Sequence, residues 1–182
     1  LTEKWSRDLP ELINFQTPDL VNIFQLIPKC TNSPKHREFQ FKLLHKILVT
    51  NKSLKLWKIK ESDLCTFCNL EIETTRHLLW DCMYVSRMWE RLFQWIQEKT
   101  DINIRFTIRD VFLGIEFEEM MIYNCLFIIA KQYIYAVRCL EKKPEFNQLL
   151  SKVKYYKNIE KYIATKNNKM HIYENKWAMF ED

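Results

Sequence analysis

Glycine occurs only once in this chain of 182 residues, at Gly114. Average usage of about 7% would give roughly a dozen glycines in a chain of this length. Glycine is the usual residue at hairpin turns, and prolines are also few, so a sheet of many strands is disfavoured. A single glycine also excludes the glycine-rich loops that hold phosphates and the nucleophile elbow of hydrolases. The chain is therefore predicted to be all-α, a compact helical domain.

The apolar residues supply one core and no membrane span. Hydrophobic residues make up 47% of the sequence, which is enough for a single domain of this length. The longest apolar run of interest, from Met120 to Ala130, is broken by Lys131, well before the roughly 20 residues that a bilayer requires. We therefore expect a soluble protein with no membrane partner.

The first residues, LTEKWSRDLP, lack an initial Met and have no charged region followed by an apolar one, so they do not form a secretory signal. They indicate a piece cut from a longer protein. Disulfides are possible in principle, but a domain of this size does not need them. We expect a reducing compartment, cytoplasm and nucleus. The six cysteines are Cys30, Cys65, Cys68, Cys82, Cys125 and Cys139.

Prolines divide the chain near position 34, since they recur at Pro10, Pro18, Pro28 and Pro34. Such spacing permits only short helices. We predict an irregular arm over residues 1–34, with a helix near Thr17 to Gln25, and a single helical domain over 35–182 that contains a zinc-binding segment at 64–98.

Apolar residues recur at helical spacing after Pro34. In the first such helix, Phe39, Leu43, Leu44, Ile47 and Leu48 share one arc, and Lys35, Lys42 and Lys46 lie on the opposite side. We expect further helices from about Met83 to Lys99, from Glu118 to Lys142 and after Pro144, with a loop at 50–63 and a break at 100–110. Cys125 and Cys139 are expected in the core.

The segment after Leu64 has the spacing Cys65-x2-Cys68-x8-His77-x4-Cys82. Two cysteines separated by two residues can turn both thiolates toward one ion, and a histidine and a third cysteine complete a tetrahedral set suited to zinc. All four ligands come from the protein, so no position remains open for water. We predict structural Zn²⁺; the alternative is four buried side chains without a metal.

His77 and Cys82 are five residues apart, which is about 140° on a continuous α-helix. Their side chains would then point away from each other, so the helix must break between them. We expect a short helix capped near Thr74 or Thr75, a kink, and a new helix from about Met83. Cys82 would then lie at a helix N-terminus, where the dipole favours a thiolate.

Positive charge lies in two blocks on either side of an acidic middle. Residues 35–60 carry eight Lys and Arg against one acid, 61–119 carry six against twelve acids, and 142–176 carry nine Lys against three Glu. This asymmetry favours a polyanionic partner; the alternative is an ordinary solvated surface. The residues predicted to contact nucleic acid are Lys35, Lys42, Lys46, Lys52, Lys55, Trp57, Lys58, Lys60, Lys154, Lys157 and Lys161.

Trp57 has two interpretations. It is either a platform on which an unpaired base stacks, among lysines that bind phosphates, or a core residue between Leu56 and Ile59. A competing hypothesis for the whole domain is an interaction module, in which zinc and apolar helix faces dock on a polymerase core or a host protein. Salt distinguishes the two hypotheses, because phosphate binding weakens as salt rises whereas an apolar interface barely responds.

No arrangement of residues indicates an enzyme. Polymerase aspartate pairs, HExxH and serine-triad patterns are absent from the sequence, and the acids of the middle region are dispersed as on a solvated face. We therefore predict a non-catalytic domain with no small-molecule substrate.

The run from Gln40 to Leu92 resembles the zinc-binding region that follows the reverse transcriptase in non-LTR retrotransposons of the LINE type. The resemblance rests on Phe41 to His45, Thr50, Asn51, Cys65, Cys68, Glu71, Glu73, His77, Trp80, Cys82 and Trp89. One departure is Met83, where many relatives have proline directly after the last ligand.

The resemblance implies that this chain is the C-terminal domain of a larger replicase. It further implies binding of template RNA or target DNA during target-primed reverse transcription, with the rest of the reverse transcriptase polyprotein as a second partner.

Overall fold

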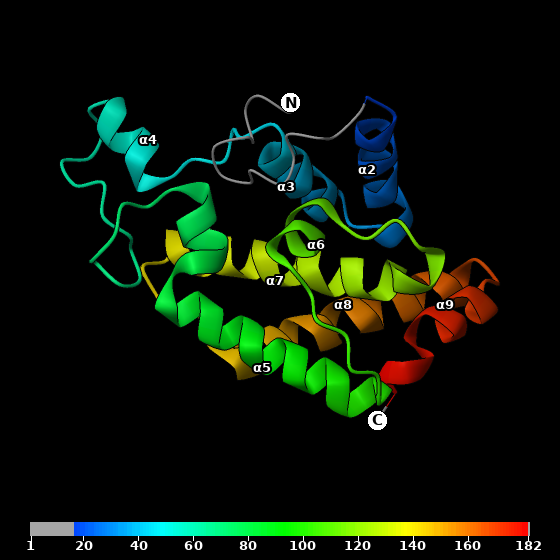
Figure 1. Ribbon diagram of the computed structural model, residues 1–182. Helices are drawn as coiled ribbons and strands as arrows, with labels where there is room; N and C mark the ends of the chain where they lie inside the picture. Colours follow the sequence, from blue (N-terminus) through cyan, green and yellow to red (C-terminus); the bar gives the residue numbers. More distant parts are fainter. Residues whose placement is uncertain (1–16, 182) are drawn as a thin grey trace.

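The computed structural model describes residues 17–181 of the chain (Figure 1). Within them, the α-helices are α2 (Thr17–Cys30), α3 (Pro34–Leu44), α4 (Asn51–Leu56), α5 (Met83–Thr100), α6 (Ile108–Leu113), α7 (Met121–Cys139), α8 (Phe146–Lys166) and α9 (Met170–Trp177). Shorter turns are the π-helix η2 (His77–Asp81) and the 3₁₀ turns η3 (Glu118–Met120) and η4 (Ala178–Phe180).

The all-α prediction is confirmed. Among the described residues, extended pairing is limited to one isolated antiparallel bridge between Leu64 and Ile72. No helix in this part of the chain combines the length and the apolar character that crossing a bilayer requires.

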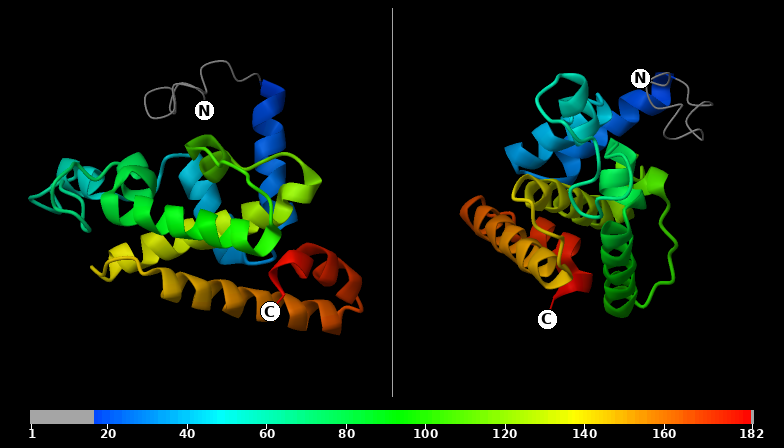
Figure 2. Two further views of the ribbon diagram at one scale, coloured as in Figure 1. Left: turned by 60° about the horizontal axis from the view of Figure 1, so that its bottom comes forward. Right: turned by 90° about the vertical axis from the view of Figure 1, so that its left-hand side faces the viewer.

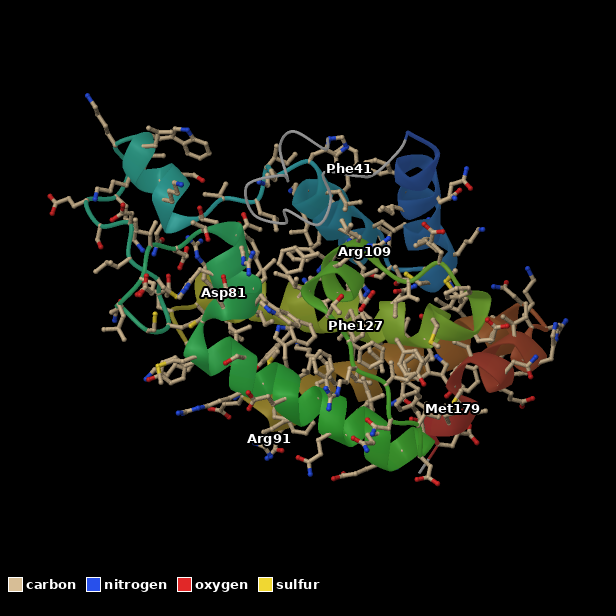
Figure 3. The ribbon with its side chains drawn as sticks, viewed as in Figure 1. Phe41, Asp81, Arg91, Arg109, Phe127 and Met179 are labelled. Atoms are coloured by element: carbon tan, nitrogen blue, oxygen red, sulfur yellow. The ribbon has the colours of Figure 1, made fainter. Side chains whose placement is uncertain are left out.

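Helix α7 is the centre of the core. It contacts α2, α3, α6, α8 and α9, and its residues from 122 to 131 are all buried. Phe127, in the middle of α7 (Figure 3), packs edge-on against Trp89 and Phe93 of α5 and against Phe106, with ring centroids 5.0 to 6.2 Å apart. The continuous apolar run that was too short for a membrane is therefore a helix surrounded by other helices.

The single glycine lies where another residue would be strained. Gly114 follows α6 with φ of 94°, a conformation that L side chains rarely adopt. A Cβ there would also lie 3.2 Å from Asn124 Oδ1. That oxygen accepts a hydrogen bond from Ile115 N, and Asn124 Nδ2 donates to Ile115 O, both at 2.8 Å. This exchange fastens the turn after α6 to α7.

Several boundaries differ from those predicted. The helix expected near Thr17 to Gln25 continues to Cys30, and the rest of the predicted arm, residues 1–16, lies outside the described part. Two helices of six residues, α4 and α6, lie where a loop and a break were expected. A further helix, α9, follows α8. Cys139 is exposed, contrary to the predicted core position, because it lies in the last turn of α7.

The helices form an elongated body with different elements at its two ends. Helix α4 and the loop after it lie at one end, and α9 and η4 lie at the other, in both Figure 1 and the left view of Figure 2. Helices α5, α7 and α8 run along the body between them (Figure 2).

Candidate metal centre

The two cysteines closest in sequence lie in a tight loop closed by backbone pairing. Cys65 N donates to Glu71 O, and Glu73 N donates to Asp63 O, both at 2.8 Å. Inside the loop, Phe67 N donates to Cys65 Sγ at 3.4 Å, and Asn69 turns the chain with φ of 55°. The loop therefore points both thiol groups inward, as the Cys-x2-Cys spacing predicts.

The predicted break between the last two ligands is confirmed in position, and it takes the form of a π-turn. Thr74 caps the start of the turn, since its Oγ1 accepts from His77 N at 3.0 Å. Cys82 N donates to His77 O at 2.9 Å, a bond between residues five apart. This wider turn brings the two ligands to the same side, which an α-helix would not do. Helix α5 begins at Met83 with Cys82 as its N-cap residue, as expected.

The four side chains have the geometry of a metal site. The ligand atoms of Cys65, Cys68, His77 and Cys82 all lie within 4.8 Å of one another. Cys65 Sγ and Cys82 Sγ are 3.8 Å apart, and two thiolates on a tetrahedral zinc ion with bonds of about 2.3 Å would be separated by about 3.8 Å. Cys68 Sγ and His77 Nε2 are 3.4 Å apart. The donor set fits Zn²⁺ and leaves no open position for substrate or water.

Comparison with known families agrees with this geometry. A family described as zinc-binding in reverse transcriptase matches residues 10–89, a range that contains all four ligands. Residues 10–89 are therefore similar in sequence to this zinc-binding family of reverse transcriptases. The match ends within α5, so α6 to α9 lie beyond it. No solved structure matches the chain.

The segment that carries the four ligands is fixed to the core by apolar contacts of the π-turn. Leu78 and Leu79 are buried, and the indole Nε1 of Trp89 donates to Leu79 O at 2.8 Å. Trp80 is only partly buried and packs against Trp89, with ring centroids 6.0 Å apart. A metal bound by the four ligands would hold the turn together, and α5 holds the turn against the rest of the molecule. Asp81, at the end of the turn, marks this region in Figure 3.

A buried ion pair fastens the same segment to α7. Glu73 is fully buried, and its carboxylate accepts from Arg138 Nη2 at 2.6 Å and from Arg138 Nε at 2.9 Å. It also accepts from the backbone N–H groups of Asn51 and Thr66, both at 2.8 Å. Burial alone would raise the pKa of Glu73, but the bonds from Arg138 and the two N–H groups outweigh burial and bring its pKa below the usual value.

The pairing of Glu73 with Arg138 could not be predicted from the sequence. Glu73 and Asn51 lie within the resemblance, but Arg138 is 65 residues away from Glu73, and charge alone does not separate it from the surface cations. A partial signal was its position at the end of the longest apolar helix, where an arginine that lies among buried residues requires a partner.

The lysines predicted around Trp57 lie together on one projecting element. We call residues 52–60 the α4 tip; Lys52, Lys55, Lys58 and Lys60 are all exposed there. Trp57 is 55% exposed, so its core interpretation is wrong. Lys55 pairs with Asp63 at 2.9 Å, and Lys60 donates to Asn51 Oδ1 at 3.2 Å. Lys52 and Lys58 extend into solvent.

The predicted lysine stripe on the preceding helix is only partly present. Helix α3 ends at Leu44, and Lys46 follows it with φ of 54°, so Lys46 is not on the helix and Ile47 is exposed instead of buried. Lys42 pairs with Glu38 at 2.6 Å on the surface, and the pair raises the pKa of Lys42. Lys35 is exposed in the first turn.

The third group of predicted contacts belongs to the other end of the molecule. Lys154, Lys157 and Lys161 lie on α8, and they line a groove with residues of α9 and η4. Because α4 and α9 lie at opposite ends of the body (Figures 1 and 2), the two lysine groups do not form one continuous patch.

Proposed function

We propose that this chain is the non-catalytic, zinc-stabilised nucleic-acid-binding domain of a LINE-type retrotransposon reverse transcriptase. It would follow the polymerase and hold template RNA or target DNA during target-primed reverse transcription. Its place of action would be the ribonucleoprotein particle, in cytoplasm and nucleus. The family match to residues 10–89 supports the association with reverse transcriptase.

The observation that carries the proposal is the composition of the α4 tip. A half-exposed indole, Trp57, lies among four exposed lysines, and this combination suits an unpaired base with phosphates on either side. The base of the tip is rigid, since Thr50 caps α4 and Asn51 is bonded to Glu73. Zinc and the Glu73 network would therefore present the tip in a fixed orientation.

A second candidate function is docking on the polymerase or on another protein. Leu56 and Ile59 on the same tip are 79% and 69% exposed, and exposed aliphatic side chains of this size are common at protein interfaces. Neither offers a flat ring to a base. The lysines and the indole outnumber these two side chains on the tip, which favours nucleic acid.

The deciding experiment measures binding of the zinc-loaded chain to single-stranded RNA, single-stranded DNA and duplex DNA at two salt concentrations. Phosphate contacts predict a slope in log salt of about −0.7 per contact for single strands. Lys52→Glu with Lys58→Glu should reduce both affinity and slope, and Trp57→Ala should weaken single-strand binding by about 1–3 kcal/mol if one base stacks there.

The matched control is Lys142→Glu with Lys152→Glu, two exposed lysines outside residues 52–60 that undergo the same change of charge. Equal losses of affinity in the two double variants would show that the α4 tip contributes only non-specific electrostatic attraction. Absence of binding at low salt would refute the proposal and favour docking on the polymerase.

A further inference from the structure

A groove of about 490 Å³ lies between α8, α9, η4 and the last turns of α5. Its apolar lining includes Trp95, Trp177 and Phe180, and its polar lining includes the three lysines of α8. The groove is far from the metal, since Trp95 is thirteen residues after Cys82, about 20 Å along a helix. Met179 on η4 and Asp81 of the zinc turn mark these two ends in Figure 3.

The floor of the groove is held by several polar bonds. Trp177 is fully buried, and its Nε1 donates to Glu160 Oε2 at 2.8 Å. Lys157 Nζ donates to Phe180 O at 2.7 Å, which ties η4 to α8. The ring of Phe180 packs against Trp95 with centroids 5.1 Å apart. Trp95 itself remains partly exposed, so part of a supported indole is open to a ligand.

The rim of the groove is cationic. Lys154 and Lys161 are exposed and lie two turns apart on the same side of α8, about 10 Å along the helix axis. Lys161 Nζ is 5.9 Å from the ring centroid of Tyr173. The carboxylate of Glu181 also lines the groove, so the three lysines leave an excess of positive charge there. An anionic ligand with a flat apolar part complements this surface.

We propose that this groove is a second contact for single-stranded nucleic acid, in which one base stacks on the open part of Trp95 and the adjoining phosphates bind Lys154 and Lys161. This inference rests on the proposed function and extends it to the end of the molecule opposite the α4 tip. Single strands are favoured over duplexes because a base must leave its stack to reach the indole.

The test compares two double variants, Lys154→Glu with Lys161→Glu in the groove and Lys142→Glu with Lys152→Glu as the control of equal charge. Lys157 is left unchanged because its ammonium holds η4. Fluorescence anisotropy with a labelled single-stranded oligonucleotide should show at least a tenfold loss for the groove variant and a smaller loss for the control. Thermal melts of both variants should match that of the wild type.

A second measurement identifies the contact directly. Irradiation of the complex with an iodouridine-substituted strand should cross-link the peptide that contains Trp95, and Trp95→Leu should abolish that cross-link while the melt shows a folded chain. If the groove variant binds as tightly as the control variant and no cross-link forms in the groove, this inference is overturned. The α4 tip would then remain the proposed contact. A wild type that binds no nucleic acid would overturn both proposals.

Discussion

Glu73 and Arg138 show how much one pair of side chains can contribute to the position of a metal site. Both are buried, and the carboxylate receives bonds from Arg138, Asn51 and Thr66, three places in the chain that are remote from one another in sequence. Removing either partner leaves the other charged and buried. The resulting decreases in the free energy of unfolding are among the largest that a single substitution produces.

We expect Arg138→Leu to lower the free energy of unfolding by about 3–5 kcal/mol, because Glu73 loses the cation that offsets its desolvation. Urea unfolding in excess zinc measures the change. The control is Arg76→Ala, which removes an exposed pair with Asp81 and should cost no more than about 1 kcal/mol. Similar decreases in the free energy of unfolding for the two variants would contradict a stabilising role for the buried pair of Glu73 and Arg138.

Lys131 is a second buried charge, and it has neutral partners. Its Nζ donates to Gln40 Oε1 at 2.7 Å and to the carbonyl oxygens of Val111 and Phe112. Burial lowers its pKa to about 7. Above that pH the folded chain releases this proton while the unfolded chain, with an ordinary lysine, retains it, so stability should increase as pH rises.

Between pH 7 and 9 the wild type should therefore gain up to about 1.4 kcal/mol per pH unit relative to Lys131→Met. Urea unfolding at both pH values tests this difference in slope, whatever the absolute stability of the variant. The test stays at or below pH 9 because burial raises the pKa of the nearby Cys30 thiol to about 11. At higher pH this thiol would add its own pH dependence to the free energy of unfolding. Parallel slopes for the two proteins would show that Lys131 does not titrate in this range.

Among the elements, the π-turn decides whether the metal ligands meet. The sequence supplied the four ligands and the need for a break, because five residues of α-helix separate two side chains by too large an angle. It could not show that a wide turn replaces a kink, since that choice depends on Leu78 and Leu79 packing into a core built from later helices. Met83 starts α5 directly after Cys82, which with ψ of 130° already leaves the helical conformation.

Replacing His77 with Ala or Cys82 with Ser should release the metal and unfold at least residues 60–98, because the π-turn and the cysteine loop share the ion. Zinc content and amide hydrogen exchange across that range measure both effects. Cys139→Ser changes an exposed cysteine outside the cluster. This variant should retain both its zinc and its protection from amide hydrogen exchange. An unaltered melt in a metal-free His77 variant would contradict a structural role for zinc.

Element length explains which helices the sequence predicted. Helices α5 and α7 span 18 and 19 residues, several turns over which apolar spacing is evident. Helices α4 and α6 have six residues each, too few for a periodic pattern, and they depend on the caps at Thr50 and Thr107. Of the two interpretations of Trp57, only the core position is wrong, because its apolar neighbours Leu56 and Ile59 are themselves exposed.

For the molecule as a whole, the charge blocks could be predicted but not their arrangement in space. The sequence places lysines at 35–60 and 142–176, and the helices then separate them, with α4 at one end and α9 with η4 at the other (Figure 2). Nothing local to α8 shows that Trp95 and Phe180 complete a groove with its lysines, because these residues are brought together only by packing around α7.

The pairing of Glu73 with Arg138 also has a consequence for synthesis on the ribosome. All four zinc ligands lie at or before residue 82, so they leave the ribosome before Arg138 does and can capture the metal first. The arginine arrives 56 residues after the last ligand, and until then the glutamate must remain in water. The metal centre can therefore bind its ion before it packs against α7, and a nascent chain stalled between these two points would carry zinc in a segment not yet docked.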